Sequence, residues 1–261
     1  MRRLLLLMAL LMLPVLAFAE EAADAPITPL RAVTTIEEVE AFLLMPEGDS
    51  LAGVKRGYIR YIAQNQRRDD TFRTGYWLGG EEGSVLDLTL KERYGVRFDF
   101  HAGNMCSRAA YSMALSYLGV DMSPGAMSAM LRTRNLYEPY DIISWKVGVE
   151  RVSANRNEFN RLMENYLTDE SYSPVYVYIR RPNGTCHALL VVAAIPDKGR
   201  YLVVDTNPPS SGGKLHRVYF ISFNKARTQI YNSTFRESLA GSTILQLYQW
   251  QLLDRSTPTA P

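Results

Sequence analysis

The second half of the chain carries short runs of β-branched and aromatic residues separated by turn residues, and this pattern limits the fold more than any other feature. The runs span residues 174–180, 187–195, 200–205, 217–223 and 243–253. Runs of this length, bounded by Gly, Pro, Asn and Asp, are typical of β-strands. Because the helical patterns mostly precede them, and strands that follow helices in blocks indicate an α+β fold, we predict an antiparallel sheet packed on helices.

Several segments outside these runs have helical character. Thr35, followed by two glutamates, predicts a helix that runs to Leu44. Further amphipathic or capped helices are expected over residues 51–64, 84–94, 121–131 and 157–167. Residues 133–153 show no clear period and leave their structure open.

A helix that begins near Cys106 is the candidate centre of function. Ala109, Met113 and Leu115 lie on one face at helical spacing, and Gly119 is a stop signal. A helix N-terminus carries partial positive charge and free N–H groups, which favour a thiolate and can bind an oxyanion. The alternative is that this cysteine is a small buried hydrophobe or half of a disulfide.

His187 opens the most apolar run, and Asp205 ends the run that follows it. With a four-residue connection, Asp205 lies opposite Leu190 and points away from His187. With a longer connection or a bulge, Asp205 lies opposite Leu189 and Asn207 lies opposite His187, so that the polar groups share one face. The sequence leaves both registers open, and a functional site requires the second.

In that second register the three side chains fit a cysteine nucleophile with its base. Cys106 would attack, and His187 would take its proton and return it to the leaving group. Asp205 would orient the imidazole and stabilise its charged form, with Asn207 as a substitute. Another histidine, His216, comes shortly after two glycines and is expected at the surface.

The stretch from Cys106 to Gly119 resembles the Cys-x3-Ala/Ser-x2-Met-x-Leu-x-Tyr-x-Gly helix of papain-like cysteine peptidases of the C39 type. Residues 174–178, His187 with its apolar run, and residues 203–205 are similar to later motifs of that family in order and spacing. The resemblance implies a papain-like α+β fold, with N-terminal helices including the cysteine helix packed on an antiparallel β-sheet. It also implies a peptide or isopeptide bond as the substrate.

The chain departs from that family at the oxyanion site. The family usually has a glutamine several residues before the cysteine, where this chain has Phe100 and His101, and often a glycine after it, where this chain has Ser107. The expected oxyanion donors are therefore the Cys106 N–H and a side chain from His101 or Asn104. An inactive relative is an alternative on these grounds.

The first residues predict export. Two arginines, an apolar run and Ala17-Phe18-Ala19 form a signal peptide over residues 1–19, cleaved after Ala19, so a secreted or extracytoplasmic protein is expected. Residues 20–94 would form a leader and helical segment, and residues 95–255 the catalytic domain. No later stretch is long and apolar enough to span a membrane.

Composition excludes several classes of partner. A net charge of +2 without a Lys/Arg run gives no case for nucleic-acid binding. Two cysteines and three histidines match no metal-ligand spacing, so neither a metal nor another cofactor is expected. The expected partner is a peptide or protein substrate, and a peptide of the cell wall is one candidate.

Two other functions stay open. A Cys106–Cys186 disulfide would make the chain a non-catalytic exported binding or structural protein, since exported chains often pair their cysteines. A transglutaminase-like acyl transferase uses the same order of cysteine, histidine and aspartate, although the separation of 81 positions from Cys106 to His187 is long.

Overall fold

A computed structural model describes residues 33–45, 52–63, 88, 91–92, 95, 106–122, 124, 148–154, 172–195, 199–224 and 229–253. The predicted signal peptide, the predicted helix over 157–167 and most of those over 84–94 and 121–131 lie outside these residues. Two short helices, α2 (Ile36–Ala41) and α5 (Cys106–Tyr117), accompany strands in the described part. Among its helices, none is both long and apolar enough to cross a bilayer.

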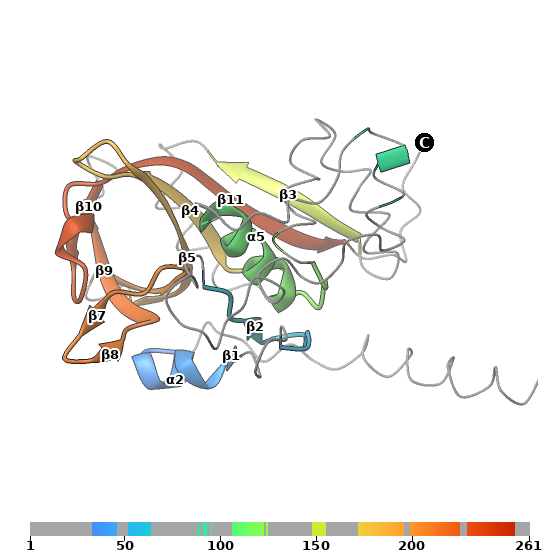
Figure 1. Ribbon diagram of the computed structural model, residues 1–261, viewed down its shortest axis with the longest axis horizontal. Helices are drawn as coiled ribbons and strands as arrows, with labels where there is room; N and C mark the ends of the chain where they lie inside the picture. Colours follow the sequence, from blue (N-terminus) through green and yellow to red (C-terminus); the bar gives the residue numbers. More distant parts are fainter. Residues whose placement is uncertain are drawn as a thin grey trace, which may run out of the picture.

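Seven antiparallel strands form the main sheet, in the order β10-β9-β6-β5-β4-β11-β3. The strands are β3 (Gly148–Ala154), β4 (Val175–Arg180), β5 (Cys186–Ile195), β6 (Arg200–Asp205), β9 (Val218–Asn224), β10 (Gln229–Ser233) and β11 (Thr243–Leu253). The first strand in this order also pairs with β11 through Gln229 and Thr243, so six strands close into a ring and β3 lies outside it (Figure 1).

Two small sheets complete the described structure. The strands β1 (Leu43–Leu44) and β2 (Ile59–Arg60) pair in parallel, and β7 (Ser210–Ser211) and β8 (Lys214–Leu215) form a hairpin. A short 3-10 helix, η5 (Glu237–Leu239), follows β10.

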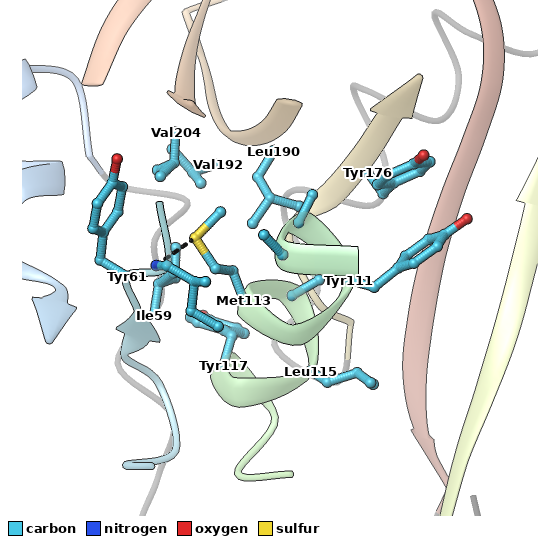
Figure 2. Close-up of a cluster of buried hydrophobic side chains, with 14 of the residues drawn as sticks. Ile59, Tyr61, Tyr111, Met113, Leu115, Tyr117, Tyr176, Leu190, Val192 and Val204 are labelled. Carbon is cyan, nitrogen blue, oxygen red and sulfur yellow. Dashed lines mark hydrogen bonds between the residues drawn. The ribbon is translucent and has the colours of Figure 1, made fainter. Parts of the chain in front are cut away.

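Apolar residues on the two faces of the sheet form separate cores. Residues from all six strands of the ring, such as Val177 and Val203, pack into one cluster, which places that cluster inside the ring. The other cluster lies on the outer face, where Met113 of α5 packs with Leu190 of β5 (Figure 2). Because β5 is buried on both faces, its sequence is a continuous apolar run with no alternation.

The five predicted strands are confirmed as β4, β5, β6, β9 and β11, and the cysteine helix packs on their sheet as predicted. β10 was missed because its sequence, Gln-Ile-Tyr-Asn-Ser, is mostly polar and short. β3 falls in the segment whose pattern was ambiguous.

The predicted papain-like α+β fold with N-terminal helices is wrong for the described chain, which is mostly antiparallel sheet. Residues 52–63, which make up most of the second amphipathic helix predicted over 51–64, contain β2. Gly57 has a φ of 83°, which interrupts any helix, and the Ile59 N–H donates to the Phe42 carbonyl of the β1 segment at 2.9 Å. Residues 59–62 are all buried, so their apolar pattern reflects burial on all sides and has no helical period.

The ends of the two helices follow the local sequence closely. Thr35 and Glu38 form a capping box at the start of α2, which confirms the predicted start, although the helix ends at Ala41 before the predicted Leu44. After α5, the Val120 N–H reaches the Leu115 carbonyl, with Gly119 at a φ of 85°. This is a Schellman-type ending, so the predicted stop at Gly119 is confirmed.

Candidate active site

Cys106 is the first residue of α5, where the helix meets the start of β5. Its side chain is buried, with 8% of the residue exposed. The thiol receives hydrogen bonds from the imidazole of His187, from Ser107 and from the backbone N–H of Ala188. The neighbouring Ser107 hydroxyl in turn accepts a hydrogen bond from the Tyr176 hydroxyl at 3.1 Å, which ties the first turn of α5 to β4.

The β5–β6 register is the one that a functional site requires. A bulge between Val191 and Ala193 shifts the pairing, so that Asp205 lies opposite Leu189. His187 and Asp205 therefore share one face of the sheet, and His187 Nε2 lies 2.6 Å from Asp205 Oδ1. That face is the inside of the ring, because Leu189, two residues from His187 on β5, belongs to the inner core.

Asn207 contributes to the site through its backbone. The strand pairing ends at Asp205, so Asn207 is not paired opposite His187. Its N–H donates to Asp205 Oδ1 at 2.8 Å, and its carbonyl accepts a short hydrogen bond from Arg236 Nη1. The structure thus gives Asn207 a role in holding the carboxylate rather than in replacing it.

Asp205 is fully buried and hydrogen-bonded on both of its carboxylate oxygens. In addition to His187 and the Asn207 N–H on Oδ1, the Tyr219 hydroxyl donates to Oδ2 at 2.6 Å and Arg236 Nη1 donates to Oδ2 at 2.5 Å. Burial raises the pKa of this carboxyl, but the positive charges of His187 and Arg236 and these hydrogen bonds outweigh burial and lower its pKa to about 2. The group is therefore an anion at neutral pH.

The thiol and the imidazole shift one another toward their charged forms. Burial raises the pKa of Cys106, but the hydrogen bond and charge of His187 outweigh it, so that the pKa lies below its ordinary value. Burial lowers the pKa of His187, but the charge of Asp205 and the hydrogen bonds to Asp205 and Cys106 raise it above its ordinary value. Because Nε2 faces Asp205, Nδ1 is the ring nitrogen left for the thiol. This arrangement favours a thiolate–imidazolium pair, the reactive form of a cysteine nucleophile.

Cys106, His187 and Asp205 are thus brought together, and the backbone of Asn207 lies beside Asp205. His101 and Asn104, the candidate oxyanion donors, lie outside the described residues. His216 stacks on the ring of Phe235, with 3.8 Å between the ring centroids.

Both cysteines are free in the structure. Cys106 is buried, whereas Cys186 is exposed at the first position of β5. Successive residues of a strand point to opposite faces, so the buried His187 and the exposed Cys186 have different surroundings. The structure therefore does not contain the alternative Cys106–Cys186 disulfide.

Tyr219 and Arg236 were missed by sequence reasoning. Tyr219 carries a usable signal, because β9 pairs with β6 and a tyrosine two residues into that strand lies diagonal to Asp205 on the inner face. Arg236 lies between β10 and η5, outside any strand run, and nothing in its local sequence marks it. Among the described residues, no group of three or more His, Cys, Asp or Glu side chains is arranged to hold a metal ion.

Comparison with known proteins adds no assignment. No family model matches the chain, and no curated protein matches it. The resemblance to C39-type peptidases therefore stays a prediction.

Proposed function

We propose that the protein is an exported cysteine hydrolase that cleaves a peptide or amide bond. The observation that carries the proposal is the chain of contacts from the Cys106 thiol to the His187 imidazole and from there to the buried Asp205 carboxylate. A nucleophile, a base and an orienting group in this order are the requirements of acyl transfer, and they recur on unrelated folds. The proposal therefore does not depend on a papain-like architecture.

The reaction would begin with attack of the Cys106 thiolate on the carbonyl carbon of the substrate. The C–N bond breaks as His187 gives its proton to the leaving amine, and a thioester remains on Cys106. Water then attacks the thioester while His187 accepts its proton, which releases the carboxylic acid and restores the thiol pair. The N-terminal end of α5 supplies donors for the oxyanion formed in both steps.

Asp205 would serve this cycle by fixing the imidazole. Its Oδ1 holds Nε2 at 2.6 Å, so the ring keeps Nδ1 directed to the sulfur. The carboxylate also stabilises the imidazolium that stores the proton between the two steps. Because all of its partners lie on the sheet or just beyond it, this orientation is built into the fold before substrate binds.

The expected substrate is a peptide or protein, and the predicted signal peptide directs the enzyme to material outside the cytoplasm, such as a cell-wall peptide. An acyl transferase would share the thioester and differ only in the acceptor, an amine in place of water. The free state of both cysteines supports a catalytic reading over a disulfide-bonded structural protein.

Alkylation of the intact mature protein by chloroacetamide, with mass spectrometry to locate the label, tests the proposal. At about pH 6, Cys106 should react faster than Cys186, because the hydrogen bond and charge of His187 favour the Cys106 thiolate. Cys106→Ala should remove this labelling and any hydrolysis of a peptide mixture, whereas Cys186→Ala should keep both. Equal labelling of the two cysteines, or labelling of Cys186 alone, would count against an activated Cys106.

A further inference from the structure

Arg236 is nearly buried beside the proposed triad, although the reaction as described makes no use of it. Its side chain is 12% exposed. Its Nη1 lies 2.5 Å from Asp205 Oδ2 and 3.5 Å from His187 Nε2, and it also bonds the carbonyl of Asn207. One guanidinium nitrogen thus contacts the carboxylate, its neighbouring backbone and the edge of the imidazole.

We propose that Arg236 is a positioning residue, which locks the Asp205 carboxylate in one orientation and offsets its negative charge so that His187 can both gain and lose a proton. The inference rests on the proposed function, because it concerns how His187 serves Cys106. It adds a fourth member to the constellation, one that acts through Asp205 and does not touch the substrate.

Hydrogen bonds to both oxygens of the Asp205 carboxylate support the orienting role of Arg236. A carboxylate held only by His187 could rotate about its Cβ–Cγ bond and lose its alignment with Nε2. Arg236 and Tyr219 both donate to Oδ2, the oxygen that His187 does not use, while the Asn207 N–H shares Oδ1 with His187. With both oxygens bonded, only one carboxylate orientation satisfies every donor.

The groups that surround the imidazole support the role of the charge on Arg236. His187 faces Cys106 from α5, Asp205 from β6, Arg236 from the segment before η5 and, through the carboxylate, Tyr219 from β9, while Arg181 after β4 interacts with Asp205 and Cys106. A buried anion alone would hold the imidazolium proton too tightly for a base that must release it in each cycle. Asp205 raises the pKa of His187 and the charge of Arg236 lowers it, so the two residues oppose one another at the same ring.

Tyr219 and Arg236 offer a matched pair for separating these two effects. Both donate to Asp205 Oδ2, but only Arg236 is charged. Arg236→Lys keeps the charge on a flexible stem, whereas Arg236→Gln keeps a donor and loses the charge. Arg200→Gln is the control, because Arg200 lies on the same strand as Asp205 and packs over Phe220, away from the constellation.

The experiment measures the rate of Cys106 alkylation by chloroacetamide against pH in full mature protein carrying Cys186→Ser. NMR spectra of the same proteins, labelled with ¹⁵N-histidine, report the titration of the His187 ring directly. In the parent we expect two steps, one where the thiolate–imidazolium pair forms and an upper one where the imidazolium loses its proton. Arg236→Gln should move the upper step to higher pH, because the charge that opposes the imidazolium is gone.

The other variants sharpen that result. Arg236→Lys and Arg200→Gln should leave the upper step in place, and Tyr219→Phe should move it less than Arg236→Gln does. If the glutamine variant does not fold, judged by circular dichroism, Arg236→Lys still decides. In Arg236→Lys, a positioning role of Arg236 predicts a lower alkylation rate than in the parent, with the upper step at the same pH. If Arg236 has no role, the profile of Arg236→Lys should superimpose on that of the parent.

Failure of this inference can be told apart from failure of the proposed function. A two-step parent profile with Arg236→Gln superimposed on it overturns the role of Arg236 and leaves the cysteine–histidine pair intact. A parent profile with one step at the pKa of an ordinary thiol overturns the proposed function and, with it, the role of Arg236.

Discussion

At the scale of single residues, the site is a row of ionisable side chains that each depend on a neighbour. Asp205 is an anion held by the cation Arg236, and Cys106 and His187 at the other end of the row shift one another toward their charged forms. Buried charges are stable only when they are paired and hydrogen-bonded, and every member of this row has such a partner. The row therefore should respond as a unit when one member is removed.

His187→Ala tests the dependence of the thiol on the imidazole. Without the hydrogen bond and charge of His187, burial is the strongest remaining influence on Cys106, so the pKa of the thiol should rise. Alkylation by chloroacetamide at about pH 6 should then fall roughly tenfold or more, and should recover at alkaline pH. His216→Ala is the control, since His216 stacks on Phe235 and should leave the rate unchanged. An unaltered rate in His187→Ala would contradict the pair.

Sequence reasoning could identify Cys106, His187 and Asp205 because each stands at the end of a recognisable element. It could not choose the register that unites them, because a bulge such as the one between Val191 and Ala193 leaves no clear mark in a run of apolar residues. Arg236 was unpredictable for another reason. It reaches Asp205 from a non-strand segment, and such contacts depend on tertiary structure alone.

At the scale of elements, α5 is the part that carries Cys106, and its packing against β2 and β5 decides where the sulfur lies. The side chain of Met113 is fully buried at this contact, and its sulfur accepts a hydrogen bond from the Ile62 N–H at 3.3 Å, drawn in Figure 2. The thioether thus fills the core and also satisfies a buried backbone donor.

Substitutions at Met113 should separate these two contributions. Met113→Ala removes packing volume and should lower the free energy of unfolding by about 2–5 kcal/mol. Met113→Leu keeps the volume but leaves the Ile62 N–H without its acceptor, and should cost about 1 kcal/mol. Urea unfolding followed by circular dichroism measures both. Met122→Leu is the matched control, since Met122 is also buried and no hydrogen bond to its sulfur is found in the described residues. Equal costs for the two leucine variants would contradict a role for the sulfur.

The elements predicted best were those with one dominant signal. β4, β5, β6 and β9 have runs rich in β-branched and aromatic residues, and α5 has both a helical period and a glycine stop. The predicted helix over residues 51–64 was wrong, because residues 59–62 within it are buried on all sides, and such a segment contains closely spaced apolar residues whatever its backbone conformation. The papain-like fold class was predicted from the resemblance, and it is wrong for the described residues because they form a mostly antiparallel sheet with two short helices.

At the scale of the whole molecule, the constellation links stability to pH. The pKa of Asp205 is about 2 in the folded chain, below the ordinary value of 3.8. A lowered pKa means that the unfolded chain binds the proton more readily, so this stabilisation is present above about pH 4 and is lost as the pH falls toward 2. It amounts to on the order of 2 kcal/mol at neutral pH.

Asp205→Asn should reveal this link. Removing one member of a buried charge network leaves the others uncompensated, so the free energy of unfolding at neutral pH should fall by about 3 kcal/mol. The difference from the parent should shrink as the pH is lowered from 4 toward 2, because the parent loses the same charge there. Urea unfolding at a series of pH values measures both effects. A difference that stays constant over this range would show that the carboxylate does not titrate as described. Glu37→Gln is the control, since Glu37 is an exposed carboxylate on α2, away from the constellation.

The closure of the sheet by β10 and β11 has a consequence for fluctuations of the native state. His187 and Asp205 stand on β5 and β6, which are hydrogen-bonded to neighbours on both sides within a ring that offers no free edge at that point. Fraying starts where strands lack a neighbour, so amide protons of these two strands should exchange with deuterated solvent only when the entire molecule opens, well after those of the two-residue pair β1 and β2. The imidazole and the carboxylate would then stay aligned through every partial opening that the rest of the chain undergoes.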